Sequence, residues 1–98
     1  MEIIKNKTEN KLEISLVGRL DTTTAPKLEE EINAEIEGVS ELILDFDKLE
    51  YISSAGLRVL LSAQKIMNRQ GSMIVKNAND DIKEVFDITG FADILTIE

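Results

Sequence analysis

The chain has 98 residues, of which 43% are hydrophobic, and its 19 acidic and 11 basic residues give a net charge of −8. This length fits one small domain, so we expect a single domain over residues 1–98 with enough buried surface for one core. The negative charge argues against nucleic acid and anionic membranes as partners, and favours folded proteins with basic surfaces.

The residue types that are missing exclude several kinds of site. The sequence contains no cysteine and no histidine. A disulfide framework and a thiolate metal site therefore cannot form, and the commonest general base and metal ligand is lost as well. The first residues are too polar for a signal peptide, and no apolar stretch approaches the ~20 residues of a membrane span. We expect a cytoplasmic protein without a metal or another cofactor.

Two strands joined by a short loop are predicted at the start of the chain. Ile3 and Ile4 centre the first strand, and residues 7–10 form a polar loop. From Leu12 to Leu20, apolar and polar side chains alternate, with Val17 as the exception. This pattern is typical of a strand with one buried and one wet face, and the short link favours antiparallel pairing.

A first helix should begin just after the second strand. The residues able to cap it are Asp21, Thr22, Thr23 and Thr24, and Pro26 suits a first turn whose N–H is not needed. Helical spacing predicts a buried face made of Ala25, Leu28, Ile32 and Ile36. Gly38 is the expected C-terminal cap. The glutamates at 29–31 spread around the helix, so we interpret them as solvated side chains.

The central stretch Leu42–Leu61 predicts a buried strand that leads directly into a second helix. A continuous apolar run opens the strand, a polar turn should follow Phe46, and Tyr51 and Ile52 should re-enter the core. The second helix should span about Ala55–Arg69. Its apolar arc is wider than one contact with a sheet requires, so neighbouring helices or a partner should use the rest.

The junction between that strand and that helix is the main candidate site. It consists of Ser53, Ser54, Ala55 and Gly56. A helix start presents unpaired backbone N–H groups and the positive end of the helix dipole, where an oxygen or a phosphate is favourable. By spacing alone, the two serines are either helix caps or a modification site, and capping is the commoner role.

The last third of the chain predicts three more elements. They are a strand over Ser72–Val75, a helix that directs Ile82, Val85, Phe86 and Ile88 inward and ends at Gly90, and a final strand over Ile94–Ile97. The order β-β-α-β-α-β-α-β with right-handed crossovers predicts an α/β fold. Because one face of the Leu12–Leu20 strand is wet, we expect a single mixed sheet with helices mainly on one face.

Evidence for an enzyme is weak. Asp45 and Asp47 stand two residues apart and could hold Mg²⁺, although such residues more often terminate a strand. No glycine-rich phosphate-binding loop is present. Ser53 and Ser54 cannot act as triad nucleophiles, because the chain has no histidine. We therefore expect no catalytic residues and no enzymatic activity.

Three segments of the chain carry sequence motifs that occur together, in the same order, in one protein family. Gly18–Ala25 fits G-x-L-D-x-x-T-A, Leu42–Leu61 matches a strand followed by a D-S-[AST]-G-L helix start in all positions of the start except Ser53, and Val85–Phe91 is similar to L-F-x-[IM]-[ST]-G-[LF]. Together they resemble the STAS domain family, specifically its free-standing bacterial anti-sigma factor antagonists. The resemblance spans nearly the whole chain and implies a β-α superhelix built on one mixed sheet.

The resemblance also implies a phosphorylation site. In that family, the serine before the small residue and the glycine is phosphorylated by a partner anti-sigma factor, which is a serine kinase. Alignment on Gly56 puts Ser54 at this position. The aspartate that precedes it in the family falls on Ser53, which makes Ser53 a second candidate acceptor. Asp21 matches the family's other acidic residue near this loop, and Thr24 matches its helix-capping threonine.

The implied function is a partner switch. Unphosphorylated, the chain would bind the anti-sigma factor and free the sigma factor; phosphorylated, it would let go until a serine phosphatase restores it. The expected partner-binding residues are Asp21, Thr22, Thr23, Thr24, Ser53, Ser54, Ala55, Gly56 and Arg58. Two alternatives stay open: a STAS adaptor of another signalling complex without a phosphoswitch, and a small-ligand or nucleotide sensor that uses the Ser54 helix start.

Overall fold

A four-stranded sheet organises the computed structural model, which describes all residues from 1 to 98. The elements in chain order are β1 (Glu2–Thr8), β2 (Lys11–Leu20), α1 (Ala25–Glu35), β3 (Glu41–Ile52), α2 (Ser54–Gln70), β4 (Ser72–Lys76), α3 (Asp80–Thr89) and a one-turn 3₁₀ helix, η1 (Phe91–Asp93). None of the helices is long and apolar enough to cross a membrane.

The sheet has the strand order β1-β2-β3-β4. β1 pairs antiparallel with β2, whereas β2 with β3 and β3 with β4 are parallel pairs. The antiparallel start and the mixed sheet are therefore confirmed. Each parallel pair is joined by one crossover helix, and right-handed crossovers that add strands on the same side place their helices on the same face.

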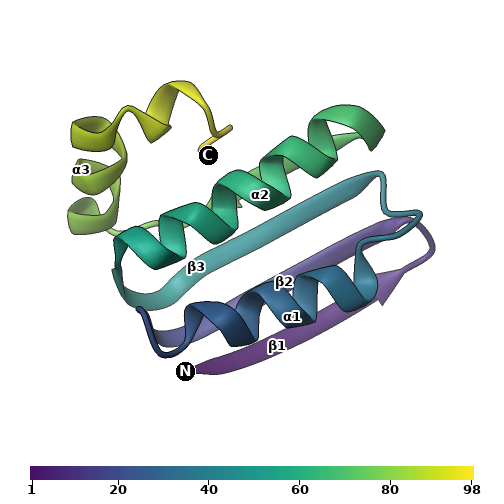
Figure 1. Ribbon diagram of the computed structural model, residues 1–98, viewed down its shortest axis with the longest axis horizontal. Coiled ribbons are helices and arrows are strands. Elements are labelled where there is room, and N and C mark those ends of the chain that lie inside the picture. The colour runs from purple at the N-terminus through teal and green to yellow at the C-terminus, as the bar shows by residue number, and fades with distance from the viewer.

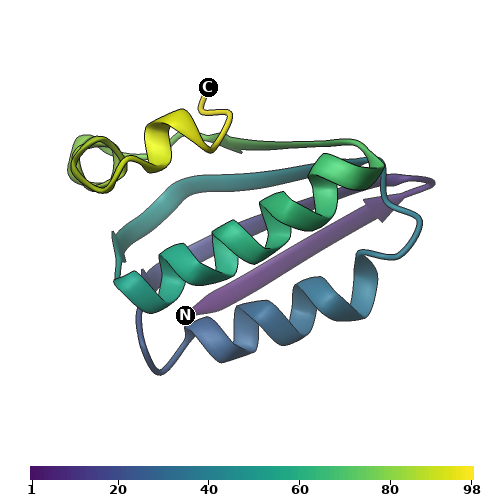
Figure 2. The same cartoon turned by 45° about the horizontal axis from the view of Figure 1, so that its top comes forward.

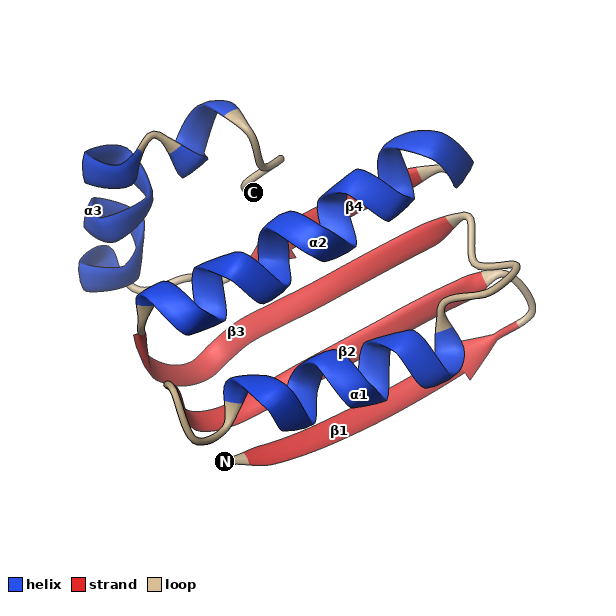
Figure 3. Cartoon of the chain, viewed as in Figure 1, coloured by secondary structure: helices blue, strands red, loops and turns tan.

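Figures 1, 2 and 3 show α1 and α2 lying side by side over one face of the sheet, while α3 stands beyond its end. The other face carries no helix, as the wet pattern of β2 predicts. The predicted fold class, a single mixed sheet with helices mainly on one face, is confirmed.

The core lies between the sheet and this helix layer. It takes the alternate residues of β2 and the apolar stripe of α1 as predicted, with Leu12, Ile14, Leu16, Leu20, Ala25, Leu28, Ile32 and Ile36 all buried. The wide apolar arc of α2 is explained by three neighbours, since α2 contacts β3, β4 and α1. Burial of these side chains supplies most of the stability of the fold.

The middle of β3 differs from the prediction. No turn follows Phe46, because the strand continues without interruption to Ile52. The β2–β3 register shifts twice, so that Phe46 and Asp47 together face Leu16, and Glu50 is an extra residue on β3. Each extra residue reverses the side of the sheet to which the following side chains point. As a result Leu49 and Ile52 are buried, and Tyr51 is 41% exposed instead of lying in the core.

Three smaller predictions are also wrong. Ile88 is 76% exposed on the outer side of α3 and does not point inward. The final strand is reduced to a single bridge from Ile97 to Val75, because the chain first turns through η1. α1 is capped by Ile36 in helical conformation, and Gly38 follows with φ +79° in the connecting turn.

Candidate functional site

The two predicted site loops lie side by side. Leu20 and Ile52 are neighbours at the ends of the parallel strands β2 and β3, and the backbone N–H of Ser53 donates to the carbonyl of Leu20 at 2.9 Å. The loop after β2 and the start of α2 therefore open at the same edge of the sheet, at the left of Figure 1. This is the edge where α/β sheets usually place their sites.

Asp21 organises the first of these loops. Its Oδ1 accepts hydrogen bonds from the Thr23 hydroxyl at 2.8 Å, the Thr23 N–H at 3.0 Å and the Thr24 N–H at 3.2 Å. These donors, the Thr23 hydroxyl most strongly, hold the pKa of the Asp21 carboxyl below its ordinary value. The carboxylate thus stabilises the conformation of its own loop. Thr22 is exposed on the surface of that loop.

Thr24 does not cap α1 with its side chain, contrary to the expectation from the family motif. Its hydroxyl accepts from the Asp21 N–H at 2.8 Å and donates to the Arg19 carbonyl at 2.9 Å. The backbone of Thr24 is already helical, with φ −100° and ψ −23°, whereas a capping residue is usually extended. The threonine closes the loop, and Asp21 satisfies the first N–H groups.

Ser53 is the N-cap of α2. Its backbone is extended, with φ −99° and ψ 175°, and its Oγ accepts from the N–H of Gly56 at 3.4 Å. Its carbonyl accepts from the N–H of Leu57 at 3.0 Å, which closes the first helical turn. The residue is half-buried. Both its side chain and its backbone are therefore committed to the start of the helix.

Ser54 has the opposite character. It is the first residue of α2, its side chain is exposed, and its hydroxyl has no hydrogen-bond partner within the protein. The two serines, which spacing alone could not separate, are thus distinguished by the structure: Ser53 is a cap, and Ser54 presents a free hydroxyl at the helix start.

Gly56 sets the height of this helix start above the sheet. A Cβ at this position would lie 2.8 Å from Cγ of Leu20 and 2.9 Å from Cγ1 of Ile52, closer than real Cβ contacts. Leu20 and Ile52 are both buried and cannot move aside freely. Only glycine lets the first turn of α2 rest directly on the ends of β2 and β3.

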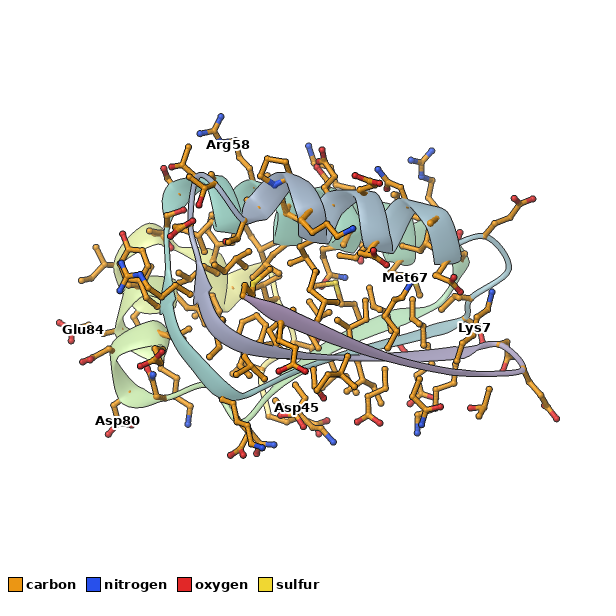
Figure 4. All side chains as sticks on the ribbon, turned by 90° about the horizontal axis from the view of Figure 1, so that it is seen from below. Lys7, Asp45, Arg58, Met67, Asp80 and Glu84 are labelled. Carbon is orange, nitrogen blue, oxygen red and sulfur yellow. The ribbon has the colours of Figure 1, made fainter.

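A shallow groove of about 310 Å³ lies between the first turns of α1 and α2, and the residue after Ser54, Ala55, lines it. Thr22, Pro26 and Glu29 line one side, and Ala55 and Arg58 line the other. In Figure 4 the Arg58 side chain stands out from the helix layer on the side turned away from the sheet. The predicted site includes Thr22, Ala55 and Arg58 but not Pro26 and Glu29. The helical pattern assigns Glu29 to solvent and gives no sign that α2 lies next to it.

A second feature that the sequence did not reveal lies on the open face of the sheet. The guanidinium of Arg19 stacks over the ring of Tyr51, 4.3 Å from its centroid, and Arg19 Nε lies 3.9 Å from Asp21 Oδ2. Arg19 and Tyr51 are register partners on neighbouring strands. The shifted register of β3 brings them together, and no local sequence pattern reports that shift.

The aspartate pair considered for Mg²⁺ is used structurally. Asp45 Oδ1 accepts from the backbone N–H of Asp47 and from Nδ2 of Asn77, both at 3.0 Å. The structure contains no group of three or more histidine, cysteine, aspartate or glutamate residues arranged to hold a metal ion. The pair does not end the strand either, since β3 continues beyond it.

Known proteins resemble this chain over nearly its whole length. BtrV of Bordetella bronchiseptica is 35% identical, over 99% of this chain and 85% of that protein. The anti-sigma-B factor antagonist of Bacillus subtilis is 31% identical, over 91% of this chain and 83% of that protein. SpoIIAA of Bacillus shares the fold at 21% identity, and the alignment covers 99% of this chain. The unphosphorylated form gives a TM-score of 0.79 over 87% of its chain, and the phosphorylated form gives 0.78 over 91%.

The match to a family model agrees with these similarities and with the fold. The model of the STAS domain matches residues 2–98, which include all four strands and the three α-helices. Relatives more than 30% identical cover 99% and 91% of this chain. The chain therefore belongs to the STAS domain family.

Proposed function

We propose that this chain is an anti-sigma factor antagonist that switches partners through phosphorylation of Ser54. Unphosphorylated, it binds an anti-sigma factor that is also a serine kinase, and the sigma factor is released. A serine phosphatase reverses the modification. The proposal is supported by the family, by a relative named as an anti-sigma-B factor antagonist and, above all, by the free, exposed hydroxyl of Ser54 at the start of α2.

The choice of Ser54 over Ser53 rests on what each hydroxyl does. In the transfer, the Ser54 Oγ–H bond breaks, Oγ bonds to the γ-phosphorus of ATP, ADP leaves and the proton passes to the kinase. Ser54 Oγ can react without disturbing the fold, because it has no partner to lose. Ser53 is half-buried, and its Oγ already accepts from the Gly56 N–H, so a phosphate on that oxygen would crowd the first turn of α2. Ser53 remains the second candidate acceptor.

The same geometry explains why the modification would change binding without unfolding the domain. A phosphate adds about −1.5 to −2 charge. At the first residue of a helix this charge meets the positive end of the dipole and is well tolerated. On a surface that docks a partner, the phosphate must lose its water when the partner binds, and this desolvation costs free energy of binding. The surface comprises Ser54 with Ala55 and Arg58 on α2, the Ser53–Gly56 turn, and the loop from Asp21 to Thr24.

The loss of the family's aspartate at position 53 motivates the alternative of an adaptor without a phosphoswitch. One observation supports the switch nevertheless: Ser53 caps α2 by accepting the Gly56 N–H. The helix start is thus preserved although the carboxylate is absent. We favour the switch for this reason, and we propose no catalytic activity for the chain itself.

Capture and phosphate mapping test this function together. The chain, immobilised through its C-terminus because Met1 lies beside Gly18 near the site loops, should retain from native cytosol a protein with a histidine-kinase-like ATPase domain. Purified and supplied with ATP, that protein should place one phosphate on Ser54, mapped by fragmentation mass spectrometry, and Ser54→Ala should accept none. Phosphate on Ser53 alone would identify the wrong acceptor. Retention of partners without any phosphate transfer would support the adaptor instead.

A further inference from the structure

We infer that Arg58 holds the phosphate once Ser54 carries one, so that phosphorylation removes a cation from the docking surface as well as adding an anion. This inference rests on the proposed function, because it concerns the modified form of the same site. Arg58 then has two roles. It engages the partner in the unmodified chain, and it binds the phosphate, and so becomes unavailable to the partner, in the modified chain. Arg58 is suited to this role by its placement, its lack of any partner and the charges around it.

The placement follows from helix geometry. Ser54 and Arg58 are both exposed on α2, four residues apart, which puts their β-carbons about 6 Å from each other on one face. Long side chains on a helix lean towards its N-terminus and cover the preceding turn. For Arg58 the preceding turn is the one that Ser54 begins. Its guanidinium fork matches the oxygens of a phosphate monoester, with which it can form two parallel hydrogen bonds.

Arg58 is also free to make this interaction. Five of the basic side chains form ion pairs in the structure: Lys5, Lys7, Arg19, Lys27 and Lys76. Arg58 forms none and projects into solvent, although Glu29 lines the opposite side of the same groove. A new dianion on Ser54 would therefore meet no established competitor for the guanidinium.

The neighbouring acidic groups favour the pair. Asp21 lies in the adjacent loop, and Glu29 lies across the groove on α1. Together with a phosphate they would give this end of the molecule a cluster of negative charge, on a chain whose net charge is already −8. Arg58 is the one cation that lines the groove. Pairing with it partly neutralises the phosphate at the place where repulsion is greatest.

Phosphorylation would therefore turn the interaction between the groove and a partner carboxylate from attraction into repulsion. In the unmodified chain the groove carries one acidic and one basic side chain, Glu29 and Arg58, and a partner carboxylate can engage the arginine. In the modified chain the arginine is occupied by the phosphate. A partner would then have to break that pair and also tolerate the phosphate, so one modification removes an attraction and adds a repulsion.

The pH titration of the phosphate tests the pair without needing a kinase. Phosphoserine is inserted at position 54 during protein synthesis, and its second ionisation, ordinarily near pH 6, is followed by phosphorus NMR. A nearby cation favours the dianion and lowers this pKa. Arg58→Gln should raise the phosphate's pKa by about half a unit, the size expected for an exposed ion pair, and Arg58→Lys should recover part of the difference.

Arg69→Gln is the matched control. It makes the same chemical change on the same helix, fifteen residues after Ser54 and so about 22 Å further along the axis. This variant should leave the pKa of the phosphate unchanged. Equal pKa values in the Arg58→Gln and Arg69→Gln proteins would overturn the inference, while the proposed function would stand. Failure to find any kinase would sink the proposed function, yet the pair would still be measurable.

Discussion

A Cβ added to Gly56 would lie 2.8 Å from the Cγ of Leu20, so the first turn of α2 rests on the end of β2 with no room for a side chain. The contact fixes where Ser54 stands relative to the loop of Asp21, because that loop begins at the residue after Leu20. The exposed Ser54 hydroxyl is thus positioned by a buried contact of Gly56, two residues further along the chain.

Gly56→Ala should therefore destabilise the fold although alanine is the better helix former. The helix preference would contribute about 1 kcal/mol in favour of alanine, but forcing a methyl group against Leu20 and Ile52 costs about 1–3 kcal/mol. We expect a net loss in urea unfolding. Ser62→Ala, at an exposed position of the same helix, should change stability by less than about 0.5 kcal/mol. A gain in stability at Gly56 would show that the helix start has room to move.

Removal of the Thr23 hydroxyl should raise the pKa of Asp21. The hydroxyl donates to Asp21 Oδ1 at 2.8 Å and is the main reason why this pKa is lowered. In Thr23→Ala the carboxyl should titrate nearer its ordinary value, as measured by carboxyl-detected NMR. Thr22→Ala is the matched control, since Thr22 makes no hydrogen bond to Asp21. If the two variants titrate alike, the loop is not held together as described.

The same shift has a consequence for stability at low pH. A carboxyl whose pKa is lower in the folded chain stabilises it at pH values above its unfolded pKa of about 3.9, and this contribution disappears as the pH falls through the folded pKa. The midpoint of urea unfolding should therefore fall less between pH 7 and pH 2.5 in Thr23→Ala than in Thr22→Ala. The opposite order would contradict the assignment of the hydroxyl as the main cause.

Ser54→Asp should leave the fold nearly unchanged. The side chain is exposed and unpartnered, and a negative charge at the start of a helix is favourable, so the free energy of unfolding should change by less than about 1 kcal/mol. Leu44→Ala, at a fully buried position of β3, should cost about 2–5 kcal/mol. Equal losses in urea melts would mean that Ser54 is part of the structural core, and a surface switch at that residue would be untenable.

The sequence predicts the features that depend on local periodicity. The alternation in Leu12–Leu20, broken only at Val17, and the helical spacing of Leu28, Ile32 and Ile36 were enough to predict β2, α1 and the side of the sheet that is covered. The closeness of the two site loops could also be predicted, because both follow neighbouring parallel strands. These inferences need only the period of each element and the direction of its connections.

What the sequence does not predict depends on how strands pair. The residues Asp47–Glu50 look like a turn because the two irregularities of β3 break its alternation, and the register with β2 is a tertiary property. The same shift moves Tyr51 out of the core and under Arg19. The exposure of Ile88, by contrast, can be predicted from helical geometry. Ile88 follows the buried Ile82 by six residues and therefore points about 120° away from it around the helix axis.

The roles of the two serines fall between these cases. Spacing placed both at the helix start, but the capping hydrogen bond from the Gly56 N–H to Ser53 Oγ depends on the backbone conformation of Ser53. The expected capping by Thr24 fails for a related reason, since its hydroxyl is drawn to the Arg19 carbonyl at 2.9 Å. Hydroxyl residues have several local partners, and only the three-dimensional structure decides among them.

The affinity of the purified partner kinase for two forms of this chain tests the central claim most directly. One form carries Ser54 unmodified and the other carries phosphoserine at position 54, and both are titrated by calorimetry in the same buffer without ATP. We predict that phosphorylation weakens binding by at least about tenfold, a loss of about 1.4 kcal/mol, while the unfolding midpoints of the two forms stay close. Equal affinities for the two forms would contradict a switch at Ser54.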